Sequence, residues 1–265
     1  MRRKRDFVQQ CFHLYILLLF LFLAAPILIV IVVSFNPEGY VRFPPSGVSL
    51  RWFQAVFMDK TFVTAIINSG KLAFLATLIS LGLGIPAAVA LGRYQFPGKY
   101  LIEAFLLSPL SLPMIVLGIA LLFYVNKIGL GLSFSSLLAG HVVITIPYIL
   151  RTVVGVYRGM DRTVEEAAMV LGANSWATFY HITLPHLKPG IIAGAIFAFL
   201  LSFDNVPVSI FLTTPETTTL PVALLSYLVY NFDPSIAAIS TLEMAFVMVA
   251  MFIVERLYGL QKLTA

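Results

Sequence analysis

Few side chains in this sequence have the types and spacings that catalysis or metal binding requires. Ser133 and His141 are the nearest approach to a nucleophile and its base, but Ser133 falls in a predicted loop without the glycine-rich setting of such a nucleophile. No H-E-x-x-H, paired-carboxylate or Cys/His metal spacing occurs. The only cysteine, Cys11, cannot form an intrachain disulfide. We therefore reject an intramembrane enzyme, and we interpret His141 as a helix-packing histidine.

The sequence also lacks the residues that nucleotide binding requires. A phosphate-binding loop needs G-x-x-x-x-G-K-[ST], so that backbone N–H groups and a lysine surround the phosphates. The nearest string, Ala65–Leu72, lacks the first glycine and the final hydroxyl residue. The sequence predicts no cofactor and no catalytic or metal site in this chain.

Two acidic residues, Asp204 and Glu243, lie within apolar runs and are the candidates for polar chemistry. A charge at the bilayer centre costs about 2.5–3.5 kcal/mol on insertion scales, so such residues usually face a cavity or a partner. Counted along their helices at about 1.5 Å per residue, the two carboxylates reach similar depths. With Asn205 they would suit a pathway for a cationic solute. The alternative is a structural role, protonated, hydrogen-bonded or paired with a residue such as Lys71.

The composition indicates a membrane protein, in which these apolar runs would be the spans. Of the 265 residues, 60% are hydrophobic and 11% are charged, and the mean hydropathy is +0.95. Soluble domains average about 25% charged residues, so the composition places the chain in the membrane class. In such a protein a net charge of +5 does not indicate binding to nucleic acid. The first apolar run is too long for a signal peptide and is expected to remain as a span. Six stretches can each cross the ~30 Å hydrocarbon core as a helix, at 14–33, 72–91, 104–125, 136–157, 190–212 and 235–254.

The basic residues predict the orientation. With the N-terminus inside, 12 of the 17 Lys and Arg residues, Lys262 among them, fall on the cytoplasmic side and five on the outer side. This is the asymmetry that the positive-inside rule expects. Both termini are therefore predicted to be cytoplasmic, and residues 1–265 are predicted to form one transmembrane domain.

The segment at 158–189 differs from the other loops because it is long, polar and helical in pattern. Its first helix is expected to begin near Asp161, to carry Glu165 and Glu166 in its early turns, and to end at Gly172 in the left-handed conformation. Asn174 or Ser175 is expected to cap a second helix, and Pro185 to stop it.

This segment resembles the EAA loop of binding-protein-dependent ABC importer permeases. The pattern E-A-A-x3-G-x9-I-x-L-P is present with its spacing intact, in Glu166, Ala167, Ala168, Gly172, Ile182, Leu184 and Pro185. We call residues 158–189 the EAA segment. The resemblance implies the type I (MetI-like) fold of six transmembrane helices. It also implies that these seven residues form a coupling helix that docks on a separate ATP-hydrolysing subunit and transmits its motion.

Within this family the chain is most similar to spermidine/putrescine-type permeases. The similarity rests on Val33–Asn36, Phe203–Ser209, and Thr213-x-Pro215 with Leu220-Pro221; Asp204-Asn205 stands where polyamine permeases often have two aspartates. A polyamine or related organic cation is thus the expected solute, and another small solute is the alternative. An ion-coupled secondary carrier would need the intramembrane acids but no EAA loop.

The resemblance also predicts the partners and the location. These are two ATP-binding subunits, a second permease that is a distinct homologue, a periplasmic binding protein, and the lipid of a bacterial inner membrane. ATP would be bound and hydrolysed by the partner subunits. This chain would supply half of the translocation pathway.

Overall fold

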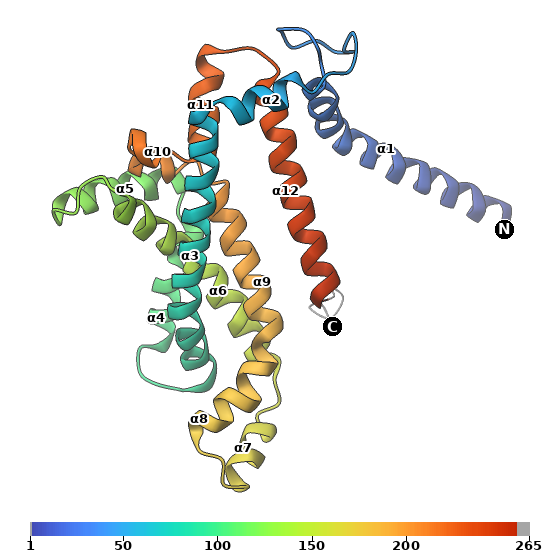
Figure 1. The fold of residues 1–265 in the computed structure, drawn as a ribbon. Coiled ribbons are helices and arrows are strands. Elements are labelled where there is room, and N and C mark those ends of the chain that lie inside the picture. Colours follow the sequence, from blue (N-terminus) through green and yellow to red (C-terminus); the bar gives the residue numbers. More distant parts are fainter. Residues whose placement is uncertain (1, 259–265) are drawn as a thin grey trace. The chain divides into compact units, whose positions relative to one another are not determined.

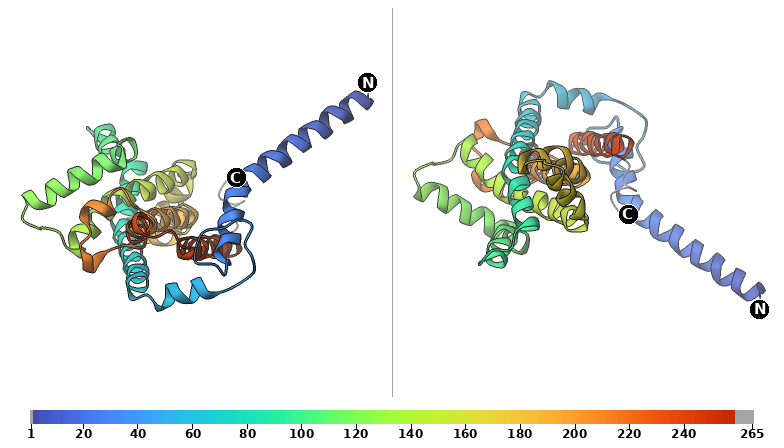
Figure 2. Two further views of the ribbon diagram at one scale, coloured as in Figure 1. Left: turned by 90° about the horizontal axis from the view of Figure 1, so that it is seen from above. Right: turned by 90° about the horizontal axis from the view of Figure 1, so that it is seen from below.

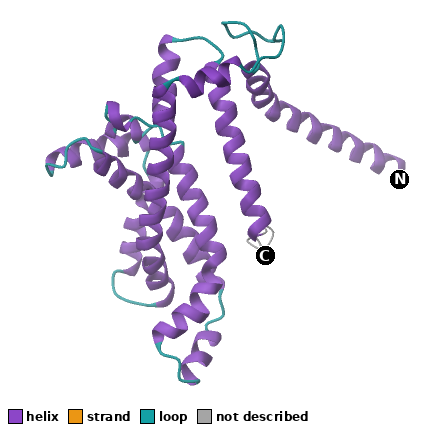
Figure 3. Ribbon diagram, in the orientation of Figure 1, coloured by secondary structure: helices purple, strands orange, loops and turns teal. Residues whose placement is uncertain are grey.

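A computed structural model describes residues 2–258, and every regular element in that range is a helix (Figure 3). The predicted all-α class is confirmed for that part of the chain. By length and composition, five helices in the described range can cross a membrane, or six if one bent pair counts as a single span. Residue 1 and residues 259–265 of the predicted domain, with Lys262, lie outside the described residues.

The chain divides into two compact units. The first combines the N-terminal region up to Val63 with Leu224–Ala250, and the second runs from Thr64 to Ala223 and includes residues from Met251 onward. The first unit contains α1 (Arg2–Ser34), α2 (Arg51–Met58), most of α11 (Leu220–Tyr230) and most of α12 (Ser235–Tyr258).

Polar and aromatic contacts hold the first unit together. The Trp52 indole N–H donates to the Asn36 carbonyl at 2.9 Å, which fixes α2 to the end of α1. The rings of Phe62 and Tyr227 meet edge to face with centroids 5.1 Å apart, and so join the start of α3 to α11. The first contact places the loop after α1 against α2, and the second places the start of α3 against α11.

The second unit is built on three long helices that run side by side, α3 (Lys60–Arg93), α6 (Phe134–Gly159) and α9 (Leu184–Phe203) (Figure 1). From this group α5 projects sideways, as the end-on views show (Figure 2). The remaining elements are α4 (Lys99–Leu107), η1 (Ser108–Ser111), α5 (Met114–Lys127), α7 (Thr163–Val170), α8 (Ser175–Thr178), η2 (Phe179–Thr183), α10 (Ser209–Leu212) and η3 (Pro215–Thr217).

Small residues let α6 and α9 approach closely. Gly190, Gly194 and Ala198 recur every fourth residue of α9 and are all buried. A Cβ atom at Gly190 would lie 2.9 Å from the carbonyl oxygen of Thr152, and one at Gly194 would lie 2.5 Å from its Oγ1. Membrane helices associate through such close backbone packing because lipid offers no hydrophobic driving force between them.

The predicted third span, 104–125, is not one straight helix. It consists of Lys99–Ser111 and Met114–Lys127, which meet at an angle of 110°. Leu112 has an extended backbone, with ψ of 141°, because the ring of Pro113 disfavours helical geometry in the residue before it. The apolar run is therefore a broken span.

The predicted fifth span, 190–212, also differs. Its helix begins earlier, at Ser175, and ends at Phe203. Asp204 leaves the helical region, and Pro207 has no N–H with which to continue it. The Asn205 side-chain oxygen accepts the Val208 N–H at 2.9 Å and closes the turn that leads into α10.

Candidate functional site

The first helix of the EAA segment forms as expected. In α7 the side chains of Glu165 and Glu166 lie in the first turn, where the helix dipole favours anions. Just before it, the Thr163 N–H donates to Asp161 at 3.0 Å, and this hydrogen bond lowers the pKa of the Asp161 carboxyl. Gly172 adopts φ of +92°, so the predicted left-handed residue after the helix is confirmed.

The second helix begins as expected but does not end at Pro185. The Asn174 side chain accepts the Ala177 N–H at 2.8 Å, so Asn174, one of the two predicted candidates, caps α8. The helix then continues through η2, a π-helical turn, directly into α9, so the prediction that Pro185 stops it is wrong. Pro185 is the second residue of α9, which begins where the π turn ends. The wider π turn accommodates a proline that an unbroken α-helix would exclude.

The motif residues divide by exposure. Glu166, Ala167, Gly172 and Pro185 are exposed, whereas Ala168, Ile182 and Leu184 are half-buried. Close to them the segment presents large apolar side chains to the outside, with Val170 87% exposed, Leu171 88% and Trp176 74%. Such an apolar patch with an acidic neighbour is typical of a protein-docking surface.

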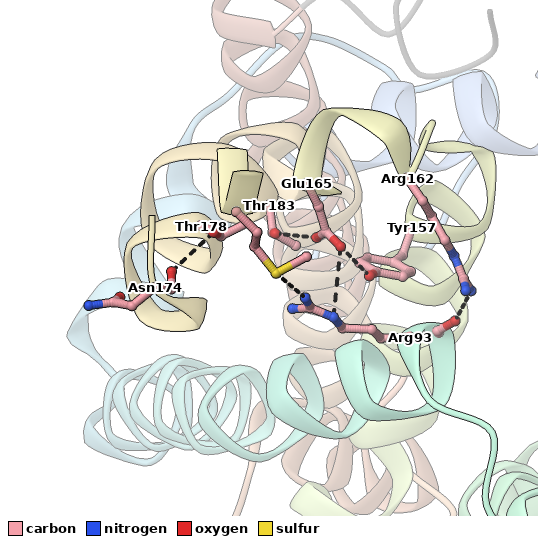
Figure 4. Close-up of polar contacts among 9 residues, drawn as sticks. Arg93, Tyr157, Arg162, Glu165, Asn174, Thr178 and Thr183 are labelled. Atoms are coloured by element: carbon pink, nitrogen blue, oxygen red, sulfur yellow. Dashed lines mark hydrogen bonds and ion pairs between the residues drawn. The ribbon is translucent and has the colours of Figure 1, made fainter. Parts of the chain in front are cut away.

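The opposite face of α7 is held by a residue that the motif did not identify. Glu165 is 3% exposed and is the one buried residue of α7. One carboxylate oxygen accepts a hydrogen bond from the Thr183 hydroxyl, and the other accepts from Tyr157 at 3.1 Å (Figure 4). The Arg93 guanidinium lies 3.8 Å from the latter oxygen. Glu165 therefore joins α7 to three other elements of the unit.

The end of α3 supplies further contacts to this inner face. Arg162 donates to the carbonyl oxygen of Gly92 at 2.8 Å, and Arg93 reaches the Met169 sulfur at 4.0 Å (Figure 4). Residues 162, 165 and 169 share one side of a helix because of their spacing. Residue 166 is spaced three or four residues from the same neighbours, so spacing alone does not separate Glu165 from Glu166.

Two of the three predicted pathway residues, Asp204 and Asn205, lie at the helix break after α9. Asp204 is exposed and follows the last residue of α9, where backbone carbonyls without helical partners carry partial negative charge. Asn205, in contrast, is 4% exposed and uses its amide oxygen to close the turn. Glu243 lies half-buried in α12, within the first unit. That Asp204 and Glu243 share one depth stays a prediction.

His141 holds the two sides of this break together. It is fully buried, and its ring nitrogens contact the hydroxyl of Ser202 at 2.8 Å and that of Ser209 at 3.0 Å. Ser202 lies before the break and Ser209 after it. The interpretation of His141 as a packing histidine is confirmed.

Replacing His141 with leucine is expected to destabilise the protein. Both serine hydroxyls would lose a buried partner, which costs about 1–3 kcal/mol. Thermal unfolding of the detergent-solubilised chain measures the loss. The exposed His181, changed to leucine in the same way, is the matched control and should leave the midpoint nearly unchanged. An equal midpoint for both variants would contradict a bridging role for His141.

Residues 80–261 match the family described as binding-protein-dependent transport system inner membrane component. The spermidine/putrescine transport system permease protein PotC of Haemophilus influenzae is 31% identical over 90% of this chain and 91% of its own length. The putrescine permease PotI of Escherichia coli is 32% identical over 93% and 90%. The molybdenum permease ModB of Escherichia coli is 34% identical over 72% of this chain and 91% of its own.

A solved structure has the same fold. It is a chain of a bacterial ABC transporter involved in the import of the acidic polysaccharide alginate, with a TM-score of 0.74, 18% identity and coverage of 96% of this chain and 98% of that one. A second structure of a bacterial alginate transporter, in complex with an alginate-bound periplasmic protein, has a TM-score of 0.72, 17% identity and coverage of 97% and 96%.

Proposed function

This chain belongs to the family of binding-protein-dependent transport system inner membrane components, as a permease subunit of an ABC importer, and we propose that its solute is a polyamine such as spermidine or putrescine. It is a multi-pass membrane protein and a transporter subunit, not an enzyme. The two permease relatives named for polyamines cover at least 90% of this chain at 31–32% identity, which supports this solute.

The exposed outer face of α7 is the observation that carries the proposed mechanism. The outer face of α7 exposes Glu166, Ala167 and Val170, while its inner face is attached to the helices of the second unit. We assign to this outer face, with Ala168, Gly172, Ile182, Leu184 and Pro185 supporting it, the contact with one of two ATP-binding subunits. Motion of that subunit would reach the spans through α7.

The remaining partners complete the machine. A second permease is needed because one chain forms only half of a pathway, and it would be a homologous but distinct protein. A periplasmic binding protein would deliver the solute. The protein would lie in a bacterial inner membrane, with both termini and the EAA segment on the cytoplasmic side.

Asp204 is proposed to contact the solute in the pathway. Its carboxylate is exposed at a break in an apolar helix, next to carbonyl groups at the negative end of α9. Ends of interrupted membrane helices are where transporters commonly bind charged solutes. A cationic amine would be attracted there and an oxyanion repelled. Asn205 supports the turn beside it, and Glu243 is the second acid proposed for the pathway.

Transport by the reconstituted importer tests this proposal. Proteoliposomes would contain this chain with its partner permease and ATPase, and would receive the binding protein loaded with labelled spermidine or putrescine. We expect uptake that requires internal ATP and is reduced by unlabelled polyamine but not by molybdate. ATP-dependent uptake of another solute would contradict the polyamine and keep the importer. Uptake that follows an ion gradient without the ATPase would instead favour a secondary carrier.

A further inference from the structure

The attachment of α7 to the rest of the second unit is centred on one buried side chain. Glu165 is the only buried residue of this eight-residue helix, and the other seven lie at or near the surface. A buried carboxylate is costly unless hydrogen bonds and an opposite charge offset its desolvation. Here Thr183, Tyr157 and Arg93 supply them. The cluster is therefore a specific connection rather than a general apolar contact.

Each partner of Glu165 belongs to a different element. Arg93 is the last residue of α3, Tyr157 lies near the end of α6, and Thr183 ends the π turn that leads into α9. One carboxylate thus contacts the ends of three helical elements at once, as Figure 4 shows.

The Tyr157 side chain extends this connection into the core. Tyr157 is 2% exposed and packs in the same apolar cluster as Leu91, Val153 and Leu187. Its ring also lies against Gly92, where an added Cβ atom would come within 2.4 Å of a ring carbon. A displacement of Glu165 would therefore be passed to close-packed side chains, which have little free space to absorb it.

We propose that Glu165 is the positioning residue through which α7 moves the spans, so that its charge sets how much transport follows from each ATP hydrolysed. The inference rests on the proposed function, because it requires an ATPase docked on the outer face of α7. It assigns different roles to neighbouring glutamates. Glu166 faces the partner, and Glu165 connects the helix to α3, α6 and α9.

The variant Glu165→Gln tests this role because it keeps the side-chain shape and removes the charge. In the whole reconstituted importer we would measure solute imported per ATP hydrolysed, together with complex yield and thermal midpoint. We expect the ratio to fall about tenfold, the effect of weakening hydrogen bonds to one charged group, while the ATPase remains bound and active. Asp161→Asn, an exposed acid beside α7, is the matched control and should keep the wild-type ratio.

Two milder variants keep the test open if Glu165→Gln fails to assemble. Tyr157→Phe and Thr183→Val each remove one hydroxyl that donates to Glu165. Each is expected to lower the ratio by less than Glu165→Gln. When either hydroxyl variant is combined with Glu165→Gln, the loss in the ratio should be smaller than the two separate losses together, because the residues form one network.

The possible results separate the two proposals. A wild-type importer without ATP-driven uptake would overturn the proposed function, and this inference with it. A coupled wild type with an unchanged ratio in Glu165→Gln, or in both hydroxyl variants, would overturn the role of Glu165 alone. A lower yield or midpoint with an unchanged ratio would show a structural role only, and would also overturn it.

Discussion

Replacing Glu166 with arginine is expected to abolish ATP-driven uptake while the chain remains in the membrane. Glu166 is exposed in the first turn of α7, where arginine would oppose the helix dipole and reverse the charge offered to a partner. Like charges placed together across an interface cost several kcal/mol, which corresponds to at least a hundredfold weaker binding. Uptake and co-purification of the ATPase subunit would both be measured.

A charge reversal elsewhere controls for a general effect. Glu216 is also an exposed glutamate in the first turn of a helix, the short η3, but it lies outside the EAA segment. Glu216→Arg is expected to retain the ATPase, because its charge would not face that subunit. Wild-type uptake and wild-type ATPase binding in Glu166→Arg would contradict the docking surface and revive the carrier hypothesis.

The second large effect is expected at Asp204. Asp204→Asn removes the exposed charge at the end of α9 and keeps a side chain of similar size. A hydrogen bond to a charged group contributes about 1.5–3 kcal/mol, so polyamine uptake is expected to fall tenfold or more. Initial rates of uptake would be measured with saturating binding protein, so that the loss reports on the permease rather than on delivery.

Binding of the ATPase subunit distinguishes the effect of Asp204→Asn from that of Glu166→Arg. Asp204→Asn should retain the ATPase, because the residue lies outside the EAA segment. Asp204→Glu restores the charge and should recover part of the uptake. If Asp204→Asn transports polyamines at the wild-type rate, Asp204 does not contact the solute and its exposure requires another explanation.

Local signals in the sequence were sufficient for much of this architecture. Long apolar runs identified the membrane helices, because each must satisfy its own backbone hydrogen bonds in lipid. Gly172 and Asn174 were predicted correctly as helix boundaries, since the left-handed conformation and the side-chain cap depend on residue type and immediate neighbours. The EAA spacing identified the segment that the fold presents at one end of the second unit (Figure 1).

Features that depend on tertiary packing could not be predicted from these local signals. Hydropathy measures the length of an apolar run but not its direction, so the 110° bend before Pro113 was missed. Pro185 was expected to end a helix. The π turn that lets the helix continue depends on the fold around Thr183, and the sequence alone does not indicate it. Glu165 and Glu166 are chemically identical neighbours. Only the position of α7 against Arg93 and Tyr157 determines which one is buried.

Cysteine cross-linking tests the central claim most directly, because Cys11 is the only native cysteine. In a Cys11→Ser background, single cysteines would replace Val170 or Leu171 on the exposed face, and His13, an exposed residue of α1, as the control. With cysteines introduced on the ATPase subunit, we expect cross-links from positions 170 and 171 that change with bound ATP, and none from position 13. The absence of cross-links from 170 and 171 in an importer active in uptake would contradict docking through α7.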